Sequence, residues 1–262
     1  MMLGYQKKDL FVYNVKIPLI IKLPKKTSNI LIAGKSGSGK SLSTLYYIAQ
    51  LIKNDESLVF IADYKAGEEY EMLEVNGAYA SGEEAVALIQ KYYEFFSLIR
   101  ERRVRLNNHY SLVIEEYSGL LNWLEMKDKK LKNVIMAMVA EMLSVGRGLN
   151  IGVILCVQRA DATYFSNGAR DQFQCVICFG RCSAEQFRML GFSGELEHNP
   201  TGNYQPGQAL VLIDGQDAPK EIIVPRIKRQ DILLANILNG LNAQPSLGEL
   251  IRAVAEGESE EL

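Results

Sequence analysis

The segment Gly34-Lys35-Ser36-Gly37-Ser38-Gly39-Lys40-Ser41 constrains this chain more than any other stretch of it. It has the phosphate-loop pattern, in which a glycine and four variable residues precede glycine, lysine and serine or threonine. The apolar run 30–33 predicts a strand entering the loop, and apolar residues at helical spacing from Leu42 onward predict a helix leaving it. Strand, loop and helix in this order predict a nucleotide-binding site.

The residues of this loop suit a nucleotide phosphate chemically. Its glycines allow positive φ angles and a close approach of the backbone, so that successive N–H groups at a helix N-terminus point at the anion. Lys40 brings a positive charge to the β- and γ-phosphate oxygens, and the hydroxyl of Ser41 can bind the Mg²⁺ that bridges them. We therefore expect residues 34–41 to bind ATP, with Ser41 as a ligand of Mg²⁺.

Further apolar runs alternate with helical periods along the chain, at residues 58–62, 112–114 and 151–157. This alternation predicts an α/β fold with a central, mostly parallel sheet and helices on both faces. The carboxyl ends of parallel strands meet at one edge, where ligands bind. We therefore expect Asp63, Glu115, Glu116 and Gln158, which end these runs, to gather with the phosphate loop in one crevice.

Two adjacent glutamates end the second of these runs, and we assign them different roles. Glu115 is expected to bind Mg²⁺, and Glu116 to orient and deprotonate the attacking water. Gln158 can donate a hydrogen bond to the γ-phosphate or to that water from a neighbouring strand. The alternatives are that the glutamates are two surface acids and that Gln158 is an ordinary polar strand end.

Composition narrows the protein class. The 262 residues are 48% hydrophobic, which is enough for one large domain or one domain with a short appendage. With 29 basic and 31 acidic residues, a protein that coats nucleic acid over its whole surface is disfavoured, although a local basic strip is compatible. No apolar run approaches the roughly 20 residues of a transmembrane helix, so we expect a cytoplasmic chain.

Cysteines and histidines have no predicted chemistry. Cys175, Cys178 and Cys182 have metal-like spacing, but the residues around them are typical of a buried strand, which we favour. The chain shows no secretory context, so its four cysteine thiols are expected to be reduced. His109 and His198 stand in polar, loop-like surroundings and receive no role.

The chain divides into three predicted parts. Residues 1–27 form an N-terminal extension with small strands at 10–13 and 18–23, and residues 28–225 form the nucleotide-binding part, which ends in a hairpin of 209–213 with 221–224. Residues 226–262 form a helical tail with helices at 232–238 and 247–254 and a frayed acidic end.

The order of these motifs resembles the motor domain of the FtsK/SpoIIIE branch of the FtsK/HerA superfamily of DNA translocases, which includes coupling ATPases of conjugative elements. Residues 28–41 resemble its Walker A segment, 61–65 its Asp-Pro-Lys strand end, and 112–116 its Walker B segment. The basic helix end 101–103, and the segment Gly146-Arg147-Gly148 followed by 151–159, are also similar to the family. Glu115 stands where the family has aspartate, and Tyr64 where it has proline.

The resemblance implies a RecA-like P-loop NTPase over residues 28–225 that forms homo-oligomeric ring hexamers with ATP between the subunits. Arg147 matches a position from which an arginine finger would reach the neighbour's γ-phosphate, with Arg159, Arg170 and Arg181 as rivals. An arginine in a structural ion pair is the alternative for each. The family also leaves room for a membrane-associated partner in secretion or conjugation.

The leading interpretation is an ATP-hydrolysing, ring-forming motor that translocates double-stranded DNA without reading its sequence, in conjugative transfer or DNA segregation. The loop 160–173, with Tyr164, Phe165, Asn167 and Arg170, is the candidate for contacting DNA phosphates in a pore, against an ordinary exposed loop. Three alternatives remain: an FtsK-like ATPase that moves a protein in secretion, a small-molecule kinase, and a nucleotide-gated scaffold without hydrolysis.

Overall fold

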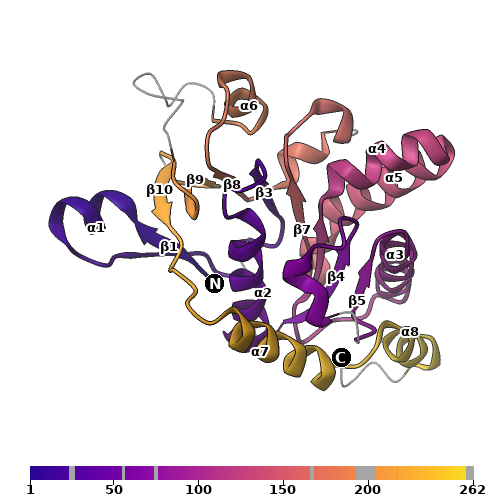
Figure 1. Cartoon of the computed structure of the whole chain (residues 1–262). Helices are drawn as coiled ribbons and strands as arrows, with labels where there is room; N and C mark the ends of the chain where they lie inside the picture. Colours follow the sequence, from indigo (N-terminus) through magenta and orange to yellow (C-terminus); the bar gives the residue numbers. More distant parts are fainter. Residues whose placement is uncertain are drawn as a thin grey trace.

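A computed structural model describes residues 1–23, 27–54, 57–73, 76–165, 168–192, 204–216 and 218–257 of the chain (Figure 1). Ten strands form one mixed sheet in the order β2-β1-β10-β9-β8-β3-β7-β6-β4-β5. The strands are β1 (Met2–Gln6), β2 (Pro18–Ile20), β3 (Ile30–Gly34), β4 (Leu58–Asp63), β5 (Tyr79–Ser81), β6 (Tyr110–Glu115), β7 (Ile151–Val157), β8 (Cys175–Phe179), β9 (Gln208–Ile213) and β10 (Lys220–Ile223).

The part of the sheet from β8 to β5 is parallel, and the strands from β9 to β2 pair antiparallel. The expected α/β fold with a central, mostly parallel sheet is confirmed, as is the hairpin of β9 and β10. Strand β7 lies between β3, which leads into the phosphate loop, and β6, which ends in Glu115. The chain therefore places the end of β7, and Gln158 after it, between the phosphate loop and the two glutamates.

Helices cover the sheet in two groups. The helices are α1 (Lys7–Tyr13), α2 (Lys40–Asn54), α3 (Glu84–Arg102), α4 (Tyr117–Lys127), α5 (Lys129–Val145), α6 (Ala184–Met189), α7 (Gln230–Ala243) and α8 (Leu247–Glu256). Helix α2 packs against α7, whereas α5 packs against both α3 and α4. In the strand order, the chain moves from β3 toward the β5 edge to reach β4, and it moves back toward β3 when it passes from β5 to β6 and then to β7. Right-handed crossovers in opposite directions place their helices on opposite faces.

The N-terminal extension differs from the prediction in one element. Residues 10–13, expected as a strand, belong to α1, which ends where Asn14 adopts a left-handed conformation with φ of 54°. A four-residue apolar run does not distinguish strand from helix. The strand of this region is instead β1, which pairs with β10 and so joins the extension to the main sheet.

The two helices predicted in the tail are present as α7 and α8. The chain between them is fixed to the sheet by Gln244, whose side-chain amide donates to the carbonyl of Val59 (2.9 Å) and accepts from its N–H (3.0 Å). The acidic end from residue 258 onward lies outside the described residues.

The cysteine prediction is confirmed, since Cys175 and Cys178 lie in the buried strand β8 and both are free thiols. Among the described residues no group of three or more cysteine, histidine or acidic side chains could hold a metal ion. His109 differs from expectation because its side chain is buried, only 3% exposed, at the start of β6, and burial lowers its pKa to about 4. His198 lies outside the described residues.

Candidate nucleotide-binding site

The phosphate loop is held in shape by glycines that no other residue could replace without strain. Gly37 and Gly39 have φ angles of 77° and 84°, in the left-handed region. A Cβ atom on Gly39 would lie 2.6 Å from the backbone nitrogen of Gly207, and one on Gly34 would lie 2.7 Å from Oγ of Ser38. The backbone N–H of Gly207 donates to the carbonyl of Ser38 (2.9 Å), so the chain before β9 supports the loop from one side.

Lys40, at the start of α2, is nearly buried and faces both predicted carboxylates. Its Nζ lies 3.4 Å from Oε2 of Glu115 and 3.8 Å from Oε2 of Glu116, and the three side chains are 6%, 4% and 11% exposed. Burial by itself would lower the pKa of Lys40, but the two carboxylates outweigh it and raise the pKa well above its ordinary value. The sheet thus brings together a lysine and two glutamates that stand 75 and 76 positions apart in the sequence.

Glu115 has a second partner that the sequence did not reveal. The hydroxyl of Tyr70 donates to Oε1 of Glu115 at 2.7 Å. Tyr70 belongs to the 3₁₀ helix η1 (Glu68–Leu73) after β4, and only 2% of it is exposed. Burial, and then the charge of Glu115, raise the pKa of the Tyr70 phenol well above its usual range. The phenol therefore stays protonated and holds the carboxylate in place.

Glu116 occupies an unusual backbone position. Its φ of 55° lies in the left-handed region, where a residue with a Cβ atom costs on the order of 1–2 kcal/mol. A Cβ on Gly119, one turn into α4, would lie 3.2 Å from Cγ of Glu116 and 3.3 Å from Cδ1 of Tyr64. The strained turn directs the Glu116 carboxylate toward Lys40, and Gly119 leaves room for its side chain.

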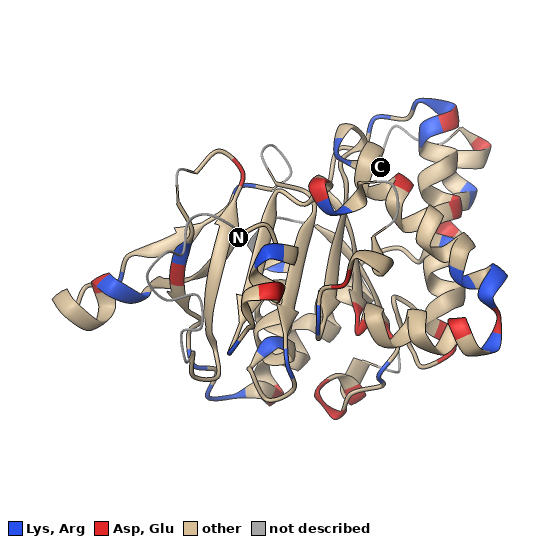
Figure 2. Ribbon diagram, turned by 90° about the horizontal axis from the view of Figure 1, so that it is seen from above, with Lys and Arg blue, Asp and Glu red and all other residues tan. Residues whose placement is uncertain are grey.

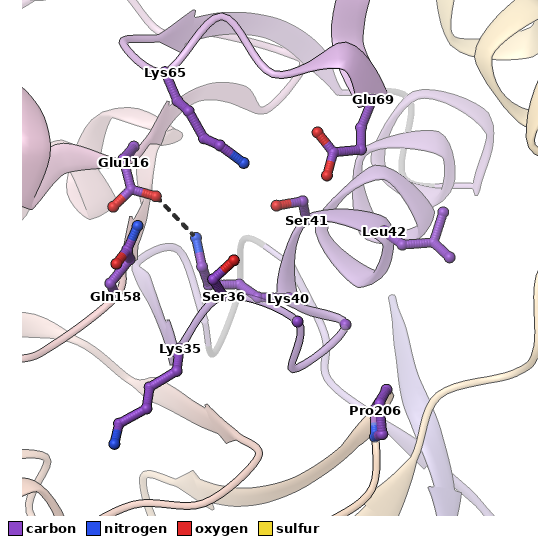
Figure 3. A pocket seen from close by; sticks show the side chains of 12 residues that line it. Lys35, Ser36, Lys40, Ser41, Leu42, Lys65, Glu69, Glu116, Gln158 and Pro206 are labelled. Carbon is purple, nitrogen blue, oxygen red and sulfur yellow. Dashed lines mark ion pairs between the residues drawn. The ribbon is translucent and has the colours of Figure 1, made fainter.

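A cavity of about 240 Å³ opens above the loop (Figure 3). In Figure 3, Glu116 and Gln158 lie on one side of Lys40, and Ser41 and Glu69 lie on the other. The structure thus brings the phosphate loop, Glu116 and Gln158 together as predicted. The lining residues are Lys35, Ser36, Gly37, Gly39, Lys40, Ser41, Leu42, Lys65, Glu69, Glu116, Gln158 and Pro206.

Four lining residues have no counterpart in the sequence prediction of the site: Leu42, Lys65, Glu69 and Pro206. Leu42 directly follows the phosphate loop, and Lys65 follows β4 in the segment 61–65 that resembles the family's strand end. Glu69 and Pro206 come from segments whose local pattern contains no motif, and they reach the cavity only through the fold.

Asp63, in contrast, does not line the cavity. Its carboxylate is buried and accepts from the backbone N–H groups of Lys65 (3.1 Å) and Gly67 (2.9 Å) and from the hydroxyl of Tyr79 (3.1 Å). Burial raises the pKa of Asp63, opposed by these hydrogen bonds. Asp63 shapes the turn that presents Lys65 and Glu69.

The arginines considered for a trans role all lie outside this cavity. Arg147 is exposed in the 3₁₀ helix η2 (Gly146–Leu149), just before β7, so it stands at the amino edge of the sheet, away from its own phosphate loop. Arg159 pairs with Glu185 (2.9 Å) and Arg170 with Asp171 (3.5 Å), both at the surface. Arg181 is exposed after β8.

The loop 160–173 is only partly exposed. Phe165 packs edge-on against Phe173 with ring centroids 5.9 Å apart, and the backbone of Ala160 is bound at both its N–H and its carbonyl by Gln186 (2.9 Å each). Asn167 lies outside the described residues.

The residues around the cavity suit ATP and Mg²⁺, which the sequence predicts to bind there. The loop offers backbone N–H groups and Lys40 for phosphate oxygens, and Ser41 contributes to the wall of the cavity beside them. Carboxylate and hydroxyl oxygens are the ligands Mg²⁺ prefers, and it takes most of the others from water and nucleotide phosphates. The hydroxyl of Ser41 and the carboxylate of Glu115 would hold it on the protein side.

Comparison with known proteins supports the fold. No protein-family model matches the chain. Over 234 residues, 82% of its length, the chain is 22% identical to the Ftsk domain-containing protein YdcQ of Bacillus subtilis (strain 168). The resemblance to FtsK-type ATPases is therefore confirmed. The chain spans about half of the curated relative, 47% of its length.

Solved structures of FtsK/HerA-type ATPase domains share the fold. The cytoplasmic domain of the type VII secretion ATPase EccC of Thermomonospora curvata matches 94% of this chain with a TM-score of 0.66, at 17% identity and over 31% of its own length. The pCW3 conjugation coupling protein TcpA, solved with ATPγS, matches 91% with a TM-score of 0.65, at 19% identity and over 69% of its length. The chain therefore shares the fold of these P-loop ATPase domains.

Proposed function

We propose that this chain is an ATP-hydrolysing, FtsK-like motor that assembles into a ring, as a hexamer, and translocates double-stranded DNA without reading its sequence. Conjugative transfer or DNA segregation is the setting we propose for it. The observation that carries the ATPase part is the buried arrangement of Lys40 with Glu115 and Glu116 beside the phosphate loop.

In this proposal the phosphate loop binds the nucleotide by its backbone N–H groups, and Lys40 turns from the two carboxylates to the β- and γ-phosphate oxygens. Ser41 and Glu115 would hold Mg²⁺, which would neutralise part of the negative charge of the phosphates. Glu116 accepts a proton from a water molecule while the water oxygen forms a bond to the γ-phosphorus. The bond from that phosphorus to the β–γ bridging oxygen breaks, and ADP and phosphate leave. Gln158 orients the water or the γ-phosphate.

Arg147 would act in the site of a neighbouring copy. Its exposure at the amino edge of the sheet suits a trans role, because an arginine that faces away from its own cavity is free to reach another. Charge stabilisation by such a finger contributes on the order of 10³-fold or more to turnover. Arg159 and Arg170 already have surface carboxylate partners, which favours Arg147 over them.

The cargo has two candidates. DNA is favoured by the sequence resemblance and by the similarity to TcpA, a conjugation coupling protein. A polypeptide is the second candidate, because EccC and EssC, the latter from Geobacillus thermodenitrificans and matching 96% of this chain at 15% identity, share the fold with a TM-score of 0.66. EccC has also been solved with a signal sequence peptide.

ATP turnover with and without double-stranded DNA tests the proposal, for the wild type and for Glu116→Gln. We expect DNA to raise turnover in the wild type, with a steep loss of the effect at high salt, and Glu116→Gln to bind nucleotide but turn it over at least 100-fold more slowly. Turnover that DNA leaves unchanged would exclude the DNA motor. Stimulation by an added peptide instead would favour the second candidate.

A further inference from the structure

The N-terminal extension exposes an unusual amount of apolar surface. We call residues 7–20 the N-terminal knob. It consists of α1, the turn that follows and β2, and Figure 1 and Figure 2 show α1 projecting from one edge of the sheet. None of the α1 side chains is buried, and Phe11, Val12 and Tyr13 are 65%, 65% and 61% exposed. Of the eleven large apolar side chains exposed in the described part of the chain, six lie in this knob.

The knob is also basic. It contains Lys7, Lys8 and Lys16 against a single acid, Asp9. Lys7 lies 3.9 Å from Glu221 and over the ring of Tyr204. Lys8 and Lys16 are exposed, and neither forms an ion pair with any residue that the structure describes. Lys16 lies over the ring of Tyr5, with Nζ 5.8 Å from the ring centroid. A contiguous exposed apolar patch is typical of an interaction site, and two exposed lysines without a carboxylate partner among the described residues indicate an acidic partner.

A surface with more acidic than basic side chains follows β4, near the other end of the strand order. We call it the acidic hollow. It is an open cavity of about 530 Å³ lined by residues 65–69 and Gln230. Glu68 and Glu69 lie in its wall and Glu71 follows in η1, and within the described residues none of the three forms an ion pair.

The two elements that border the hollow, η1 and α7, also expose apolar side chains. Met72 in η1 is 44% exposed, and Ile232 in α7 is 48% exposed, two residues beyond Gln230. Helix α7 packs against η1, and both side chains lie beside the lining residues of the hollow in sequence but are not among them. Acidic groups in a hollow, with apolar side chains on the elements that border it, are what a basic, apolar projection needs in a partner.

The topology keeps the knob from filling the hollow of its own chain. The knob follows β1 and includes β2 at one end of the strand order, and residues 65–69 follow β4 near the other. Seven strand spacings separate β1 from β4, roughly 34 Å. A contact between knob and hollow is therefore a contact between copies, and since its two surfaces differ, it repeats head to tail and closes into a ring or continues as a filament.

We propose that the N-terminal knob of one copy docks into the acidic hollow of the next copy of this chain. The proposal rests on the ring assembly proposed above and names the surfaces that form it. Lys65 and Glu69 line both the hollow and the nucleotide cavity, so the docked knob lies directly beside bound nucleotide. Nucleotide binding and docking consequently affect each other through the same two side chains.

Charge reversal with rescue tests the docking. The knob variant is Lys8→Glu/Lys16→Glu and the hollow variant is Glu68→Lys/Glu71→Lys, which leave the cavity-lining Lys65 and Glu69 intact. Analytical ultracentrifugation at low salt should show self-association weakened at least about tenfold in each variant, because like charges then meet. An equimolar mixture of the two variants should assemble again, and so should a chain that carries all four changes.

Control variants at exposed residues outside the knob and the hollow distinguish the proposed docking from a nonspecific effect of changing surface charge or surface apolarity. Lys130→Glu, an exposed lysine on α5 without an ion pair among the described residues, should leave assembly unchanged. Phe11→Ser/Val12→Ser should weaken assembly, whereas Met126→Ser, at a side chain that is 83% exposed on α4, should not. Assembly that survives both charge reversals, or a mixture that fails to associate, overturns the proposal.

Two further outcomes distinguish this proposal from others. If the knob variants assemble normally but lose binding to vesicles of phosphatidylglycerol and phosphatidylcholine, the knob is a lipid-binding surface and the docking is wrong. If charge reversal and rescue hold while DNA leaves turnover unchanged, the docking is right and the DNA motor is wrong. If DNA stimulates turnover while the charge-reversal variants assemble normally, the DNA motor is right and the docking is wrong.

Discussion

Replacing Lys40 by methionine should destabilise the fold as well as abolish nucleotide binding. The variant keeps the length of the side chain but leaves Glu115 and Glu116, whose side chains are 4% and 11% exposed, without their cation. Removing one partner of a buried ion pair costs about 3–5 kcal/mol, because the remaining charge is desolvated and unpaired. We expect a loss of that size in the free energy of unfolding at pH 8, with no nucleotide present.

The raised pKa of Lys40 sets the pH range of this loss. The stabilising contribution of Lys40 is fully present below its ordinary value of 10.5 and is lost only as pH rises through the still higher folded value. The wild type therefore keeps this contribution from pH 8 to pH 5, and Lys40→Met should lose it at both pH values.

Urea unfolding of the two proteins, followed by circular dichroism at pH 8 and pH 5, measures this loss. Lys65→Met is the matched control, since Lys65 lines the same cavity but is exposed and forms no ion pair with the described residues. It should cost less than about 1 kcal/mol. A loss below about 1 kcal/mol for Lys40→Met at both pH values would refute the electrostatic reasoning.

Two more predictions concern the glycines of the loop and the buried histidine. Gly39→Ala should abolish binding of a fluorescent ATP analogue, because its Cβ meets the neighbouring backbone at 2.6 Å, whereas Gly37→Ala, with open space around the Cβ, should cost only the roughly 1–2 kcal/mol of its positive φ. Because the folded pKa of His109 is lowered to about 4, the wild type should lose on the order of 3 kcal/mol as pH falls from 6.5 to 4, and urea unfolding of His109→Gln should show a shallower loss over that window.

The parts of the site that sequence reasoning found are those encoded in short segments. Gly34 to Ser41 form a contiguous motif, and Glu116 and Gln158 follow apolar strands directly, so one rule about strand ends places them at a common edge. That rule does not predict the order of the strands in the sheet. The position of β7 between β3 and β6 depends on how the whole chain packs and not on any one stretch of residues.

Tyr70 shows why other site residues were missed. Its role depends on a hydrogen bond to a residue 45 positions away, and its own segment, a 3₁₀ helix rich in glutamate, has no periodicity that predicts burial. Asp63 shows the converse error. It ends a strand as Glu115 does, but the chain turns so that its carboxylate bonds its own loop. The position of a residue at a strand end therefore predicts the region in which its side chain lies, whereas the conformation of the following turn determines where the side chain points.

The segment after β4 joins the two proposals made for this protein. Asp63 fixes the turn, the turn presents Lys65 and Glu69, and these two side chains face both the nucleotide cavity and the acidic hollow. Tyr70, the next residue, bonds Glu115 in the catalytic centre. A knob that docks beside Glu69 would therefore be one residue from the group that positions Glu115, so assembly would influence hydrolysis without any long-range rearrangement. Glu69→Gln, which removes the shared charge, should for that reason alter both self-association and the turnover of the assembled protein, while Glu71→Gln, outside the nucleotide cavity, should alter turnover only as far as it weakens self-association.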